Sequence, residues 1–160
     1  MKTLVVGLGN PILGDDGVGW KVAEEIKKQL PPNSLVGVDF LSLGGISLME
    51  RLIGYDCVVL IDAFALDNPI GSILVLNLSD LPNYSAFHTA SPHDTSLQNA
   101  IELGKSMGAK LPDDVTVVGI ATKRLHDFSE TLSPPITDAV PQAVKFVLDL
   151  LGEKALPRIS

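Results

Sequence analysis

The sequence predicts a three-layer α/β/α sandwich with a mostly parallel, twisted central sheet of about five strands. Short apolar runs of strand length alternate along the chain with segments that carry apolar residues at helical spacing. This alternation is typical of a sheet that is covered by helices on both faces. The most strand-like run, 56–63, is continuously apolar from Cys57 to Ile61, as expected of a buried central strand.

Each element is predicted from its apolar pattern and from the turn residues that bound it. The expected strands are 2–8, 35–41, 56–63, 72–78 and 114–120. The fourth strand alternates in polarity, which places it nearer an edge. The expected helices are 17–30, 46–53, 95–107 and a final helix that follows Pro134 and Pro135 and runs to 151. Pro31 and Pro32 end the first helix, Gly54 closes the second, and 79–92 has little periodicity and is predicted to be a long loop.

Apolar stripes predict which face of each helix packs on the sheet. They comprise Val18, Val22, Ala23, Ile26 and Leu30 in the first helix; Ile46, Met49 and Ile53 in the second; Leu97, Ala100, Ile101 and Leu103 in the third; and Val140, Val144, Val147, Leu148 and Leu151 in the last.

Length and composition limit the class of protein. The 160 residues suit one domain, 1–160, and the apolar share of 46% argues against disorder. The apolar runs are too short to span a membrane, and the first residues lack a signal-peptide cleavage pattern. One cysteine, Cys57, allows neither an internal disulfide nor a thiolate cluster, and we expect it to be an inert buried thiol. The net charge of −7 argues against nucleic-acid binding. We expect a cytoplasmic monomer.

The stretch 4–20 is the most informative part of the chain. A short strand leads into Gly7 and Gly9, which allow a sharp turn, and Pro11 and Gly14 keep the connection non-helical. Asp15 and Asp16 then precede the first helix, where a carboxylate commonly acts as a cap. Two adjacent acids exceed what capping needs. The glycines match neither a dinucleotide-binding fingerprint, because position 12 is isoleucine, nor a phosphate-binding loop.

Three side chains are predicted to meet at the carboxyl edge of the sheet. Asp16 follows the first strand, Asp62 ends a central strand, and His93 precedes a helix. Two carboxylates and an imidazole suit a divalent metal and leave positions open for water or substrate. The alternative is structural for each: a cap for Asp16, a turn contact for Asp62, and a helix start for His93. His88 and His126 are the competing histidines.

Several motifs in order resemble the hydrogenase maturation endopeptidases. These are GLGNPILGDDGVG at 7–19, VVLIDA at 58–63, SPHD at 91–94 and DFSETLSP at 127–134, and the resemblance extends over nearly the whole chain. The resemblance implies a nickel-dependent endopeptidase that trims the C-terminus of nickel–iron hydrogenase large-subunit precursors. It further implies that Asp16, Asp62 and His93 contact the nickel, which the substrate brings and the isolated protein holds weakly or not at all.

The resemblance has one departure and leaves alternatives. Many family members carry an Asp-Gly-Gly turn after the second strand, whereas here Asp39 is followed by Phe40-Leu41-Ser42-Leu43 before Gly44-Gly45. A non-catalytic nickel-binding or precursor-binding chaperone on the same scaffold and a general metallopeptidase are alternative functions. LVVGLGNP at 4–11 also opens the peptidyl-tRNA hydrolases, but the match stops there and the acidic charge does not suit tRNA.

Overall fold

The chain is described by a computed structural model for residues 1–81, 84, 95–123 and 127–155. The predicted order of strands and helices is confirmed in this part of the chain. The elements are β1 (Thr3–Leu8), the 3-10 turn η1 (Gly14–Gly17), α1 (Val18–Gln29), β2 (Val36–Leu41), α2 (Gly45–Leu52), β3 (Cys57–Ala65), β4 (Ile73–Asn77), the 3-10 turn η2 (Leu78–Asp80), α3 (Leu97–Ser106), β5 (Asp114–Thr122) and α4 (Pro134–Ala155).

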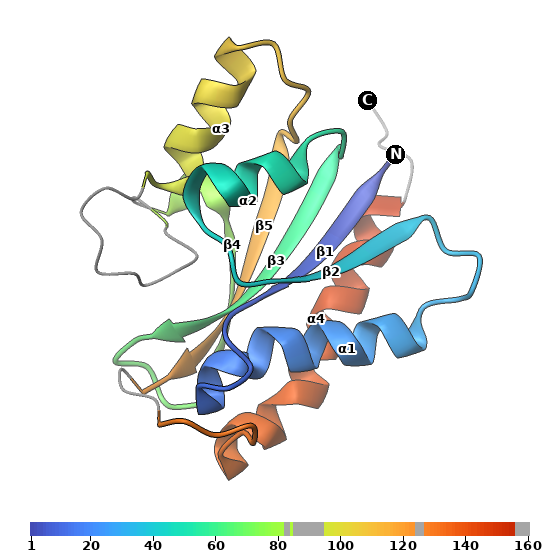
Figure 1. Cartoon of the computed structure of the whole chain (residues 1–160). Helices are drawn as coiled ribbons and strands as arrows, with labels where there is room; N and C mark the ends of the chain where they lie inside the picture. The colour runs from blue at the N-terminus through green and yellow to red at the C-terminus, as the bar shows by residue number, and fades with distance from the viewer. Residues whose placement is uncertain (82–83, 85–94, 124–126, 156–160) are drawn as a thin grey trace.

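The strands form a five-stranded sheet in the order β2-β1-β3-β5-β4 (Figure 1). The first four are mutually parallel, and β4 pairs antiparallel with β5 at the edge, which confirms the predicted edge position of the fourth strand. The chain leaves β1 toward β2 on one side, whereas β3 leads to β5 and β4 on the other. The point at which the order reverses, between β1 and β3, is where open α/β sheets bind their ligands.

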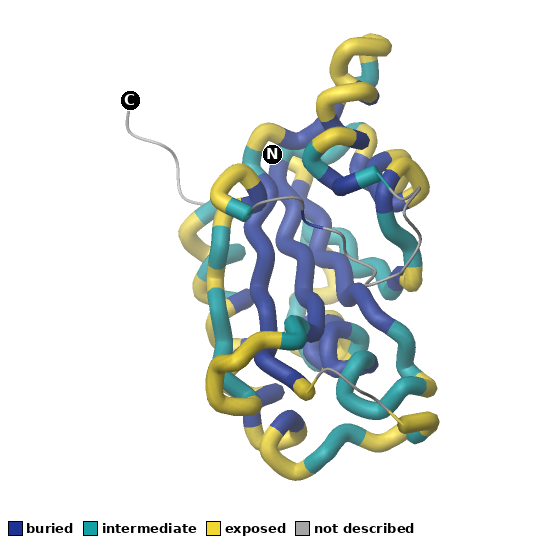
Figure 2. The backbone as a smooth tube through the Cα atoms, turned by 90° about the vertical axis from the view of Figure 1, so that its left-hand side faces the viewer, coloured by how far each residue is buried: buried dark blue, intermediate teal, exposed yellow. Residues whose placement is uncertain are grey.

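Two apolar cores lie on the two faces of the sheet, so the predicted three-layer sandwich is confirmed. Helices α1 and α4 cover one face, and α2 and α3 cover the other (Figure 1). The first seven residues of β3 are buried, and Figure 2 shows central strands of the sheet in dark blue. Val58 and Leu60 belong to the core under α2 and α3, whereas Val59 and Ile61 belong to the core under α1 and α4.

The predicted core face of α2 is correct at Met49 and wrong at Ile46 and Ile53. Ile46 and Ile53 are 44% and 45% exposed, whereas Leu48 and Leu52 are fully buried together with Met49. This short helix carries apolar residues around most of its circumference, so two overlapping stripes satisfy helical spacing equally well. Packing against α3 selects the stripe that contains Leu48 and Leu52.

The other helices keep most of their predicted stripes. Leu103 of α3 is 46% exposed, and Gly104 takes the buried position beside Met49 and Leu111. In α1 and α4 the central stripe residues are buried, and Leu30, Leu148 and Leu151 at the helix ends are half-buried. None of the helices in the described part of the chain combines the length and apolar composition that a bilayer crossing requires.

Strands β3 and β5 run two residues further than their patterns predict. Ala63, Phe64 and Ala65 pair with Ile120, Ala121 and Thr122, so each strand supplies the other with hydrogen-bond partners beyond its apolar run. The extension has a consequence for the candidate site, because Asp62 lies inside β3 and not at its end.

Candidate functional site

Asp16 and Asp62 meet where the order of the sheet reverses, as predicted from their places after β1 and near the end of β3. Asp16 lies in η1 directly after the β1 turn, and Asp62 lies on the neighbouring strand β3 one position beyond the Gly7–Ile61 pair. The two carboxylates are close enough that the negative charge of Asp16 raises the pKa of Asp62. The structure therefore brings together two of the three predicted site residues.

Asp62 is a buried carboxylate, only 1% exposed. Its place in β3 puts its side chain on the same face as Leu60, toward α2 and α3. The Tyr84 hydroxyl donates a hydrogen bond to Asp62 Oδ2 at 2.9 Å, and the backbone N–H of Ala63 donates a second. Burial is the main cause of a pKa well above the usual carboxyl range, the charge of Asp16 adds to it, and the two donors oppose it.

The loop that carries Asp16 is shaped by glycines. Gly7 lies within β1 and does not turn the chain; its missing side chain allows α1 to approach, because a Cβ there would lie 2.5 Å from the Gly19 carbonyl oxygen. Gly9 makes the turn with a φ of 135°, a region that favours glycine. The backbone N–H of Asn10 then donates to Asp16 Oδ2 at 2.8 Å, which orients this carboxylate.

Neither aspartate caps a helix, so the capping alternative is wrong. Both η1 and α1 begin without a side-chain cap hydrogen bond. Asp15 instead reaches the residue before α4: Ser133 donates to it through its backbone N–H and through its hydroxyl, each at 2.7 Å. The two adjacent acids thus have separate roles, since Asp15 joins the loop to the start of α4 and Asp16 stays beside Asp62.

Further bonds hold this loop on both sides. Toward α4, Gly14 N–H donates to Ser129 O and Ser129 N–H donates to Ile12 O, at 2.8 and 2.9 Å. Toward β2, Trp20 Nε1 donates to Leu41 O at 3.1 Å and Ser42 Oγ donates to Gly9 O at 2.6 Å. Leu41 and Ser42 belong to the stretch that replaces the Asp-Gly-Gly turn of the resembled family, and they therefore support the Asp16 loop.

His93, the third predicted site residue, lies outside the described residues, as do His88 and His126. The described chain resumes at Thr95, whose backbone oxygen is 3.0 Å from the position of a Cβ built on Gly45 at the start of α2. No three His, Cys, Asp or Glu side chains within the described ranges are grouped to hold a metal ion. The three-residue metal site therefore stays a prediction.

Tyr84 is a site residue that the sequence did not reveal. It is 6% exposed, its ring lies 5.8 Å from that of Phe64, and its hydroxyl bonds Asp62. A single tyrosine in a segment without periodicity carries no local signal of burial. Cys57 is buried, as predicted, at the opposite end of β3 from the candidate site.

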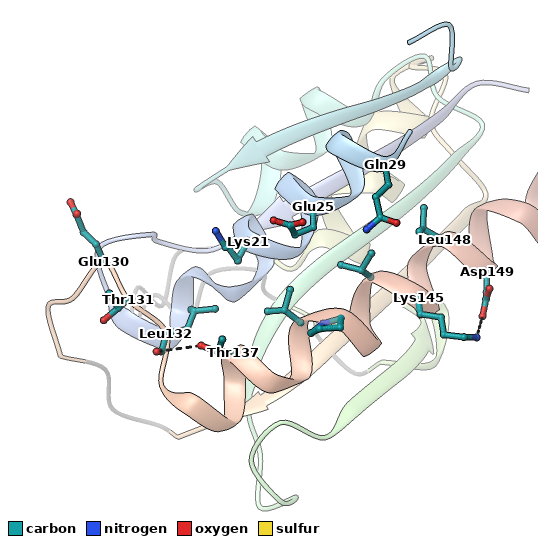
Figure 3. Close-up of a pocket in the computed structure, with 13 residues that line it drawn as sticks. Lys21, Glu25, Gln29, Glu130, Thr131, Leu132, Thr137, Lys145, Leu148 and Asp149 are labelled. Carbon is teal, nitrogen blue, oxygen red and sulfur yellow. Dashed lines mark hydrogen bonds and ion pairs between the residues drawn. The ribbon is translucent and has the colours of Figure 1, made fainter. Parts of the chain in front are cut away.

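A groove of about 740 Å³ between α1 and α4 lies apart from these carboxylates (Figure 3). Its floor is apolar, with Val140, Val144 and Leu148 from α4. Lys145 and Asp149 on its rim are paired with each other at 2.9 Å and are well exposed. The groove lies on the α1 and α4 face of the sheet, whereas Asp62 points to the other face, so the groove is separate from the candidate site.

Comparisons with known proteins agree with this architecture. The family model described as hydrogenase maturation protease matches residues 20–150. The hydrogenase expression/formation protein HupD of Thiocapsa roseopersicina is 26% identical over 95% of this chain and 68% of its own. The hydrogenase 2 maturation protease of Escherichia coli K12 is 25% identical over 99% and 97%. The structure of the hydrogenase maturating endopeptidase HybD from E. coli superposes with a TM-score of 0.76 at 25% identity, over 97% of this chain and 94% of that one.

Proposed function

Because this chain belongs to the hydrogenase maturation protease family, we propose that it removes the C-terminal extension of a nickel-loaded nickel–iron hydrogenase large-subunit precursor. The family consists of peptidases, so the reaction class is hydrolysis of a peptide bond. The observation that carries the proposal is the burial of Asp62 beside Asp16 where the strand order reverses. A buried carboxylate next to a second acid is costly unless a cation or a proton joins it.

In this proposal the nickel arrives as part of the substrate and is recognised by Asp16, Asp62 and His93. Carboxylate oxygens and an imidazole nitrogen form a modest, hard to borderline ligand set, which completes the coordination of a metal already held elsewhere. A thiolate-rich set would compete for the ion and remove it from the precursor. The single cysteine of the chain, Cys57, lies at the far end of β3 and does not contribute such a ligand.

The hydrolytic step has two candidate routes on this geometry. The metal can polarise the scissile carbonyl or activate a water molecule. Alternatively, one of the two aspartates can act as the base that activates water. In either route an unloaded precursor lacks the bridging ion and is not cut, so the metal itself provides specificity.

The test incubates nickel-loaded precursor with the purified protein and measures the released C-terminal peptide by mass spectrometry and gel mobility. We expect the peptide to be released from the nickel-loaded precursor and not from the metal-free precursor. A stable complex without cleavage would instead identify a non-catalytic maturation chaperone. Cleavage of casein at a comparable rate would identify a general peptidase.

Variants test the assigned residues in the same assay. Asp16→Asn, Asp62→Asn and His93→Ala should each leave the large subunit in its longer precursor form. His88→Ala serves as the matched histidine control and should retain processing. Normal processing by all three site variants would remove the metal bridge from the proposal.

A further inference from the structure

Tyr84 is held through its backbone, its ring and its hydroxyl. Its backbone oxygen accepts a hydrogen bond from Leu97 N–H at 2.9 Å, at the first residue of α3. Its ring packs beside Phe64 of β3, with 5.8 Å between the ring centroids. Its hydroxyl donates to Asp62 Oδ2 at 2.9 Å inside the protein. The hydroxyl is therefore delivered to one carboxylate oxygen by contacts from α3 and β3.

Packing alone does not explain a tyrosine at this position. Phenylalanine would fill the same space beside Phe64 and would bring no polar group into the core. A buried hydroxyl needs a partner, and the partner here is one of the two carboxylates of the candidate site. The specific property of Tyr84 is thus a hydrogen bond to Asp62.

The bond limits how Asp62 can present its oxygens. The terminal torsion of an aspartate is broad and roughly two-fold, so an unconstrained carboxylate can offer either oxygen or both to a metal. Because Oδ2 accepts from Tyr84, the hydroxyl restricts the orientation in which the carboxylate can meet a ligand. Partners of this kind orient metal ligands and strongly affect metal affinity.

We propose that Tyr84 is a positioning residue, whose hydroxyl fixes the orientation in which Asp62 meets the metal carried by the substrate. This inference rests on the proposed function and adds a residue to it. Tyr84 touches neither the metal nor the peptide; it acts through Asp62. Asp16 is oriented in the same way by the backbone N–H of Asn10, so each carboxylate has its own donor.

The test replaces Tyr84 by phenylalanine, which removes one oxygen atom and keeps the ring beside Phe64. We expect single-turnover cleavage of the nickel-loaded precursor to fall by roughly 10- to 100-fold, the usual effect of losing a partner of a metal ligand. The matched control is Tyr55→Phe. Tyr55 lies before β3 at the other end of the sheet, where the Lys2 ammonium group is 4.7 Å from its ring centroid. If the reaction uses only the carboxyl edge, cleavage by Tyr55→Phe should stay within about twofold of wild type.

A second measurement separates positioning from packing. Binding of the loaded and the metal-free precursor is compared for wild type, Tyr84→Phe and the packing variant Phe64→Leu. If Tyr84 acts through the metal, Tyr84→Phe weakens binding of the loaded precursor only. Phe64→Leu, which leaves the hydroxyl in place, should lower stability while retaining the preference for loaded precursor.

The outcomes distinguish this inference from the proposed function. Wild-type cleavage by Tyr84→Phe, or an equal loss of binding to loaded and metal-free precursor, would overturn the positioning role while the protease function stands. Failure of the wild-type protein to cleave loaded precursor would overturn the proposed function itself, and the role of Tyr84 with it.

Discussion

Replacing Gly7 by alanine tests how closely α1 must approach the sheet to place Asp16. A Cβ at this position would lie 2.5 Å from the Gly19 carbonyl oxygen and 2.8 Å from the Ala23 Cβ, whereas ordinary contact begins at 3.4 Å. The first turns of α1 would have to withdraw by several tenths of an ångström. Overpacking of this kind costs about 1–3 kcal/mol of the free energy of unfolding.

Because the groups that obstruct the new methyl include backbone of α1, we expect the upper part of that range. For a chain of this size each kcal/mol lowers the melting temperature by about 2–4 °C, so a decrease of roughly 4–12 °C should follow. Differential scanning calorimetry and urea denaturation measure it. The matched control is Gly152→Ala in α4, where no atom of the described residues outside the helix's own backbone lies within 4 Å of the added Cβ. There the same substitution should stabilise by up to about 1 kcal/mol through helix propensity.

The functional part of this prediction follows from the same displacement. Asp16 lies in η1, directly before α1, so a shift of the helix start moves its carboxylate relative to Asp62. Misplacement by about 1 Å can cost on the order of 100-fold in rate. We therefore expect Gly7→Ala to process precursor far more slowly at a temperature at which it is folded. Equal or higher stability than wild type, with normal processing, would refute the close approach of α1 to β1.

Two further predictions concern the carboxylates. Burial, and then the charge of Asp16, raises the pKa of Asp62 in the folded state above its value in the unfolded chain. The stability that comes from the protonated carboxyl is therefore fully present below the unfolded pKa, and it is lost as the pH rises through the folded pKa. Asp62→Asn should thus unfold at a higher urea concentration than wild type at pH 7, and the difference between the two proteins should be smaller near pH 4. A difference that grows on acidification would contradict the raised pKa of Asp62. Ser133→Ala removes the 2.7 Å hydroxyl bond to Asp15 and should lower the free energy of unfolding by about 1–3 kcal/mol, measured by denaturant titration. Ser133→Thr keeps a hydroxyl and should retain most of that free energy. Equal stability of wild type and both variants would show that this bond does not hold the loop.

The sequence predicts the order of the elements because their signals are local. The apolar run from Cys57 to Ile61 can be buried on both faces only as a central strand, and β3 is central. The strand that the sequence places nearer an edge, around Val75, is the edge strand β4. Gly54, with a φ of 92°, ends α2 where the sequence predicts a helix end. Each of these signals depends on residues within a few positions of one another.

The core face of α2 shows where local signals fail. Its apolar residues allow two stripes, and the choice between them depends on α3, which lies some fifty residues further along the chain. Periodicity alone contains no information about which neighbour a helix will meet. The stripe with Leu48 and Leu52 is buried because those side chains fill the space against α3, and Ile53 is left exposed.

In the candidate site, too, some features follow from local sequence signals and others from long-range packing. The sequence by itself determined that Asp16 follows one strand and that Asp62 lies near the carboxyl end of another, because strand and turn positions are encoded locally. Only the tertiary structure decided that Asp15 bonds Ser133, 118 residues away, and that Tyr84 reaches Asp62. The physical reason is that a buried hydrogen bond depends on which surfaces pack together, and packing is a property of the whole chain.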